Sequence, residues 1–302
     1  MEESGLPRAR RGCSHPGMRL SVVSGGFAPV ADGVGLVELA ESCGLDGVWL
    51  AEHVGFRDCV VPAAAGLART SRVDVGVAGP APASRHPGLL AMELASLAEL
   101  GPGRVRAQVG LGGEPLVARL GGSHRDAVRT AREFVTVLRA LLAGERVTGT
   151  FAGATFDGLR LAHAAPVALD LLAMRPRMLE LAAEVADGVS LSAGASAAYL
   201  TRVVRSLRTS GGFRVTAMAV GAVAESERAA LAAVEPAFRM LPPVLAEGAA
   251  GRRELAFVAT PDTVADELAR YAATGIDELA LTLFGDPHHL PGTLRLLATH
   301  CP

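Results

Sequence analysis

Short apolar runs alternate with longer segments of helical spacing along most of this chain. The runs are apolar at successive positions, which is typical of parallel strands covered on both faces. We therefore predict that they are buried strands of a parallel sheet. The eight predicted strands are Met18–Val23, Asp46–Ala51, Val73–Ala78, Val105–Val109, Val167–Ala173, Val189–Leu191, Phe213–Val223 and Ile276–Phe284.

The segments between these runs carry signals for helix ends. Gly44 follows the segment 34–43 as a C-terminal cap, and Pro176 stands where a helix begins and its missing N–H is tolerated. Strand and helix alternate about eight times, which predicts an α/β fold of the (β/α)8, or TIM barrel, type. Residues 144–166 leave this alternation and predict a small hairpin insertion. A doubly wound open sheet is the alternative, but no GxGxxG follows the first strand.

The domain organisation and the composition narrow the picture further. We expect residues 1–17 to form a disordered tail and residues 18–302 a single barrel domain. A net charge of −2 and 4% aromatic residues argue against a nucleic-acid partner. No apolar run reaches the roughly 18 residues of a membrane span. Four cysteines without metal-type spacing indicate a reduced compartment and no metal site. We expect a cytoplasmic protein with a small-molecule substrate.

Candidate chemistry lies where predicted strands end, because TIM barrels carry their sites at the carboxyl ends of the strands. His53 follows the second strand and can exchange a proton near neutral pH, or it can simply bond a loop carbonyl. Gly112 and Gly113 follow the fourth strand and allow a flat or phosphorylated ligand to approach closely. Glu114, beside them, is either an acid acting on that ligand or a surface residue.

Two arginine-containing segments begin predicted helices. Arg175 and Arg177 flank Pro176, and two guanidinium groups at a helix N-terminus are suited to bind phosphate. The alternative is a solvated helix end. Arg85 and His86 precede another helix, where they either act on a ligand or only cap and pack.

Several segments in order resemble the luciferase-like monooxygenase superfamily, particularly its branch that uses the deazaflavin coenzyme F-420. The resemblance spans about residues 18–285. It rests on AESCGLDGVWLAEH, TSRVDVGVAG, SRHPGLLAMELASLAELGPGRVRAQVGLGGEP, RPRMLELAAEVADGVSL and TPDTVADELARYAATGIDELALT. It implies a bacterial-luciferase-like (β/α)8 barrel that binds a deazaflavin, or alternatively FMN, at its carboxyl face.

The resemblance also implies roles for residues at that face. His53 corresponds to an active-site histidine of coenzyme F-420 enzymes. Ala78 and Gly79 correspond to a strand bulge that often carries a non-prolyl cis peptide against the deazaflavin. Residues 112–114 correspond to a Gly-Glu turn that places an acid near the ring in some members.

Four further residues correspond to the phosphate-binding turn of the family: Arg175, Pro176, Arg177 and Met178. The family commonly has glycine where Arg175 stands. The arginine therefore either adds a charge to the phosphate site or obstructs it.

The function implied by the resemblance is hydride transfer between a deazaflavin and an activated C=C or C=N bond, with a reductase as the expected direction. His53 and Glu114 are the expected catalytic residues. A reduced-FMN monooxygenase is one alternative, and a paralogue that binds without a cofactor is another. Because dimers are common in the superfamily, a homodimer is also an expectation.

Overall fold

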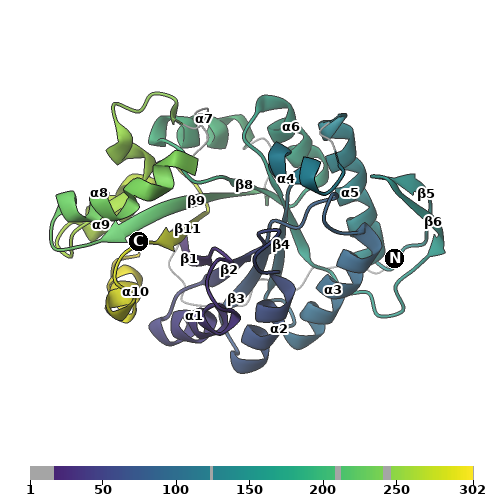
Figure 1. Cartoon of the computed structure of the whole chain (residues 1–302), viewed down its shortest axis with the longest axis horizontal. Helices are drawn as coiled ribbons and strands as arrows, with labels where there is room; N and C mark the ends of the chain where they lie inside the picture. The colour runs from purple at the N-terminus through teal and green to yellow at the C-terminus, as the bar shows by residue number, and fades with distance from the viewer. Residues whose placement is uncertain (1–16, 123–124, 208–211, 241–245, 302) are drawn as a thin grey trace.

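The chain folds as a closed barrel of eight parallel strands (Figure 1). The computed structural model describes residues 17–122, 125–207, 212–240 and 246–301, so residues 1–16 of the predicted tail 1–17 lie outside them. β1 pairs with β2, and the pairing continues through β3, β4, β7, β8 and β9 to β11, which pairs again with β1. The barrel strands are β1 (Arg19–Ser24), β2 (Gly47–Ala51), β3 (Asp74–Ala78), β4 (Val105–Val109), β7 (Ala168–Leu172), β8 (Gly188–Leu191), β9 (Arg214–Val223) and β11 (Glu278–Leu283). The predicted (β/α)8 barrel is confirmed.

A further strand, β10 (Phe257–Ala259), was not predicted. It pairs in parallel with the end of β9, where Gly221 lies opposite Phe257. A Cβ at Gly221 would come within 2.9 Å of the Phe257 Cβ, so glycine permits this close pairing. Three residues are too few to show a strand period in the sequence.

Helices cover the outside of the barrel (Figure 1). They are α1 (Val30–Cys43), α2 (Val60–Arg69), α3 (Pro87–Leu100), α4 (Glu114–Arg119), α5 (Ala127–Leu142), α6 (Pro176–Val185), α7 (Ala197–Leu207), α8 (Glu227–Val234), α9 (Val264–Ala272) and α10 (Leu290–His300). The short helix α4 was not predicted. Within the described ranges, no helix combines the length and the apolarity that a bilayer span requires.

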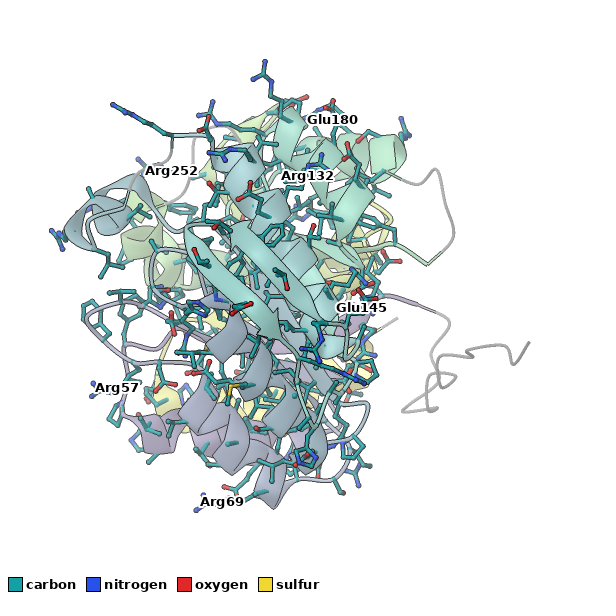
Figure 2. The ribbon with its side chains drawn as sticks, turned by 90° about the vertical axis from the view of Figure 1, so that its right-hand side faces the viewer. Arg57, Arg69, Arg132, Glu145, Glu180 and Arg252 are labelled. Carbon is teal, nitrogen blue, oxygen red and sulfur yellow. The ribbon has the colours of Figure 1, made fainter. Side chains whose placement is uncertain are left out.

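The predicted insertion is a two-stranded antiparallel hairpin, β5 (Val147–Phe151) and β6 (Ala154–Leu159). It lies across the outer surface of neighbouring helices (Figure 2). Phe156 is buried and packs against the ring of His86, with 5.2 Å between ring centroids. The hairpin thus extends the outer layer and does not contribute to the barrel wall.

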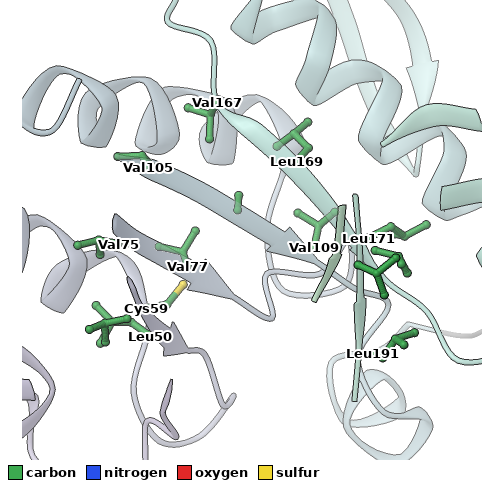
Figure 3. Close-up of a cluster of buried hydrophobic side chains, with 14 of the residues drawn as sticks. Leu50, Cys59, Val75, Val77, Val105, Val109, Val167, Leu169, Leu171 and Leu191 are labelled. Carbon is green, nitrogen blue, oxygen red and sulfur yellow. The ribbon is translucent and has the colours of Figure 1, made fainter. Parts of the chain in front are cut away.

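The main core lies between the strands and the helices (Figure 3). Alternate residues of each strand point outward, so that Val75 and Val77 of β3 and Leu169 and Leu171 of β7 are buried beneath helices. Burying one such side chain contributes roughly 1.5–3 kcal/mol. The residues between them point into the barrel.

The barrel interior is filled by a tryptophan and a network of charges. Trp49 lies against Gly76, where a Cβ would come within 2.2 Å of the indole ring. Arg106 pairs with Glu278 and, at 2.7 Å, with Asp170. Glu278 also accepts hydrogen bonds from Ser21 Oγ (2.6 Å) and Trp49 Nε1 (2.9 Å). These side chains come from strands on opposite sides of the barrel, so the network joins its walls across the interior.

Candidate cofactor and active site

The predicted site residues follow four neighbouring barrel strands. Ala51 at the end of β2 lies opposite Ala78 of β3, Ala78 lies opposite Gln108 of β4, and Val109 lies opposite Leu171 of β7. The segments that follow these strands therefore begin side by side at one edge of the barrel. This is the carboxyl edge, where TIM barrels place their active sites.

His53 lies in a tight turn directly after β2. Phe56 N donates a hydrogen bond to His53 O (2.8 Å), and His53 N donates one to Arg57 O (3.1 Å). The imidazole Nδ1 is buried and has no hydrogen-bond partner among the described residues. Burial lowers the pKa of His53, against the opposing influence of the Gly25 backbone and the Glu52 carboxylate. His53 is therefore neutral near pH 7, the state in which an imidazole can accept a proton.

Two phenylalanines that the sequence analysis missed lie beside His53. The ring of Phe27, in the loop after β1, is tilted over the imidazole with 4.2 Å between centroids. Phe56 meets Phe27 edge-on at 5.1 Å. The available signal was their position: the chain has only nine phenylalanines, and these two follow the first two strands.

Glu52 and Arg85 join the loops after β2 and β3. Arg85 donates to Glu52 Oε2 through Nε (3.0 Å) and Nη2 (2.6 Å), and to both carboxylate oxygens of Glu93 at 2.7 Å. Burial disfavours its charge, but Glu52 and Glu93 raise the pKa of Arg85 above its usual value. Arg85 thus holds the segment carrying His53 in place.

His86 acts as a helix cap. Its Nδ1 accepts a hydrogen bond from Gly88 N (3.1 Å) at the beginning of α3, and Pro87 occupies the first helical position. For both Arg85 and His86, the structure favours the capping and packing interpretation over a direct role toward a ligand.

The turn after β3 forms one wall of the candidate site. All described peptide bonds are trans, so the cis peptide that the resemblance implies for Ala78 and Gly79 is wrong for this structure. Gly79 instead has φ +102°, a conformation that residues with a Cβ rarely adopt. Its N–H donates to Gln108 O (2.9 Å), and a Cβ would lie 3.1 Å from Glu52 O. Glycine therefore makes the turn with a trans peptide.

The segment after β4 forms the next wall. Gly112 has φ +75°, and a Cβ on Gly113 would meet nothing within 4 Å. These glycines are exposed and present bare backbone at the carboxyl edge. Glu114 begins α4, but its side chain lies outside the described residues, so its role as an acid stays a prediction.

The beginning of α6 presents cationic groups at the same edge. Pro176 is the first helical residue, and Arg175 O accepts hydrogen bonds from Met178 N (2.9 Å) and Leu179 N (3.0 Å). Arg175 and Arg177 are exposed, and neither makes an ion pair with another described residue. Met178 is half-buried against the core. The two guanidinium groups are free to bind an anion.

These features fit a flat cofactor that carries a phosphate. The glycine turns have bare backbone, Arg175 and Arg177 carry positive charge, and His53 is a titratable group at the same edge. In the described part of the chain, no three or more His, Cys, Asp and Glu side chains are placed to bind a metal ion.

Curated relatives share about a third of the aligned residues. A 5,10-methylenetetrahydromethanopterin reductase of Methanolobus tindarius is 32% identical over 157 residues, 52% of this chain and 48% of the relative. An F-420-dependent glucose-6-phosphate dehydrogenase of Beutenbergia cavernae is 35% identical over 184 residues, 56% of this chain and 54% of the relative. The chain thus spans about half the length of the curated relatives it matches.

Solved structures extend the likeness of the fold over nearly the whole chain. The coenzyme F-420-dependent tetrahydromethanopterin reductase from Methanopyrus kandleri superposes with a TM-score of 0.80 at 16% identity, over 94% of this chain and 98% of that chain. The sequence model of luciferase-like monooxygenases matches residues 14–278. The chain therefore belongs to the luciferase-like monooxygenase family of deazaflavin- and flavin-dependent oxidoreductases.

Proposed function

We propose that this protein is a coenzyme F-420-dependent oxidoreductase that binds the deazaflavin at the carboxyl edge of the barrel. The observation that supports the proposal is that three kinds of group lie at the ends of neighbouring strands, at the same edge of the barrel. These are the neutral His53 after β2, the bare glycine turns after β3 and β4, and the arginines after β7 that form no ion pair with a described residue. The relatives named above, two of them F-420-dependent by name, support it.

The residues of this chain would divide the work of binding. Ala78, Gly79, Gly112 and Gly113 offer backbone walls to the flat ring system, while Arg175 and Arg177 hold the phosphate. The Glu52–Arg85 ion pair fixes the position of the turn that carries His53 relative to the loop after β3. Fixing the reacting groups in this way lowers the entropic cost of reaction.

The chemistry proposed for the site is hydride transfer to an activated C=C or C=N bond. A bound reduced deazaflavin supplies the hydride from a ring carbon. The other atom of the bond must take up a proton, and neutral His53 would relay one from solvent, accepting it at one imidazole nitrogen and releasing it from the other. Glu114 is the second proposed proton donor.

Titration of the purified protein with each cofactor tests this proposal. Oxidised coenzyme F-420 should bind saturably, seen as a change in its fluorescence, and FMN should bind more weakly. Reduced F-420 should then be oxidised by an acceptor found in a screen of activated alkenes and imines. Tight FMN binding with oxygen-dependent turnover would instead make the protein a flavin monooxygenase. If neither cofactor binds, the protein is a binding paralogue and the proposal is wrong.

A further inference from the structure

The two phenylalanines beside His53 are large apolar side chains left open to solvent. Phe27 is 54% exposed and Phe56 is 61% exposed, although half of the chain is hydrophobic and most of its large side chains are buried. Each follows a different barrel strand, yet their rings meet at 5.1 Å. We call Phe27 and Phe56 the aromatic pair.

The backbone is shaped to bring the pair against His53. A Cβ at Gly25 would lie 3.2 Å from the Phe27 ring, so glycine leaves room for that ring to fold back over the loop. Gly26 has φ +70°, and a Cβ there would lie 2.4 Å from Ala51 O and 3.4 Å from His53 Nδ1. The two glycines thus allow the loop after β1 to lie directly on the segment after β2.

The groups around the pair leave few polar partners for a sugar or a cation. Glu52 is engaged by Arg85, and Asp58 accepts hydrogen bonds from Val60 N (2.7 Å) and Val61 N (3.0 Å) at the beginning of α2. Arg57, which follows Phe56 in the chain, is exposed. Exposed aromatic faces favour stacking with another planar ring, and the two neighbouring carboxylates are already engaged by protein groups.

We propose that the aromatic pair is the substrate-binding surface of this site and selects a planar, uncharged ring system, which it holds beside His53. The proposal rests on the proposed function for the reaction that follows binding. Binding itself depends only on the rings and on the loop that carries them. We assign the pair to the substrate rather than the cofactor because the groups proposed to bind the cofactor, the glycine turns and the two exposed arginines, follow β3, β4 and β7.

A series of simple amides tests the selection by calorimetry, with and without saturating oxidised coenzyme F-420. 2-Naphthamide should bind more tightly than benzamide, and benzamide more tightly than cyclohexanecarboxamide, which has the same size but no planar ring. Phe27→Ala should weaken 2-naphthamide binding by about 2- to 10-fold. Phe27→Leu should lose the preference for planar rings yet keep the binding of cyclohexanecarboxamide. Leu89→Ala, which removes an equally exposed side chain from α3, should change nothing.

The NMR signal of the His53 Cε1 proton locates the bound probe. It should shift when 2-naphthamide is added to the wild type and shift less in Phe27→Ala. The proposal would be overturned if the three amides bound the wild type with equal affinity, or if Phe27→Ala bound them as tightly as the wild type does. A loss of coenzyme affinity in Phe27→Ala would also overturn it, because that loss would assign the pair to the cofactor. If no cofactor binds the wild type but the amides bind in the expected order, the role of the aromatic pair is supported and only the proposed function is wrong.

Discussion

The interior of the barrel and its carboxyl edge differ in which charged side chains they leave without an ion pair. Toward the amino ends of the strands, Arg106, Glu278 and Asp170 are buried and paired with one another. At the carboxyl edge, Arg175 and Arg177 are exposed and make no ion pair with a described residue, and His53 Nδ1 is buried without a partner. The interior thus pairs these three charged groups, whereas the carboxyl edge, beside its own Glu52–Arg85 pair, also keeps groups without a partner among the described residues.

The difference separates what holds the barrel together from what a ligand can use. A buried charge that loses its partner is costly, so the interior network tolerates little change. Groups without a protein partner add little to stability, but a ligand can bind them without first breaking a contact. Substitutions in the interior should therefore change the free energy of unfolding, and substitutions at the carboxyl edge should change ligand binding and turnover.

The largest effect is expected from Arg106→Met, which removes the central cation of the interior network. Glu278 and Asp170 would then be left buried without their shared partner. We expect the free energy of unfolding to fall by about 3–5 kcal/mol, measured by urea denaturation.

The control is Arg132→Met, because Arg132 forms a half-exposed pair with Glu184 on the outer helices. A surface pair of this kind contributes about 0–1 kcal/mol. If the two variants were destabilised equally, the interior network would be no more important to folding than a surface ion pair.

His53→Gln addresses the carboxyl edge. Loss of a positioned proton-transfer group should slow oxidation of the reduced deazaflavin by about 10²- to 10⁴-fold. Binding of the oxidised coenzyme and the urea midpoint should stay near their wild-type values, because glutamine keeps a polar side chain that can bond the Gly25 backbone as His53 does. Single-turnover kinetics and the fluorescence titration check the two halves of this expectation. A variant with the wild-type rate would remove His53 from the mechanism.

Glu278 makes the stability of the interior network depend on pH. Burial alone would raise the pKa of Glu278, but Arg106, Arg19 and the Ser21 hydroxyl lower it from 4.5 to about 2. The unfolded chain therefore binds this proton at a higher pH than the folded protein does. The stabilisation is complete above about pH 4.5 and is lost as the pH falls toward 2.

Comparison with Glu278→Gln isolates this contribution. Between pH 4.5 and about 2, the unfolding free energy of the wild type should fall more steeply with pH than that of the variant. The difference in slope should correspond to the uptake of up to one extra proton per molecule on unfolding. Other carboxylates whose pKa is lowered, such as Glu41 and Glu267, remain in both proteins and cancel in the difference. Parallel pH curves would show that Glu278 does not titrate in this range.

Elements with long patterns were predictable from the sequence. The pattern of apolar strands predicted the barrel, and Pro176 correctly predicted the first residue of α6. β10 and α4 were not predicted, because segments of three and six residues are too short to show a strand or helix period. The order of the elements follows from patterns along the chain, whereas short elements depend on what they pack against.

The site was predictable in position but not in its pairings. The residues expected at the carboxyl edge do follow neighbouring strands. The sequence did not show that Glu52 would bind Arg85, 33 positions away, or that Phe27 would lie over His53. Both contacts form only once the loops after adjacent strands lie side by side. Partner choice among distant residues is a tertiary property that local pattern does not encode.

Arg175→Gly is expected to have the smallest effect, and it tests whether the unpaired charges at the carboxyl edge serve a ligand. Glycine is tolerated at a helix N-cap, and Arg175 makes no side-chain cap that the change would remove. Loss of one exposed charge should weaken coenzyme F-420 binding by about 2- to 5-fold. The loss should shrink as salt is added, because salt screens the attraction between exposed charges.

The same deazaflavin without its phosphate separates charge from shape. If Arg175 binds the phosphate, the substitution should leave the affinity for this ligand unchanged. If Arg175 instead obstructs the site, both ligands should bind Arg175→Gly more tightly than the wild type, at every salt concentration. Arg175 would then be an exposed cation that costs the site affinity, and freedom from protein partners would no longer identify the groups that serve a ligand.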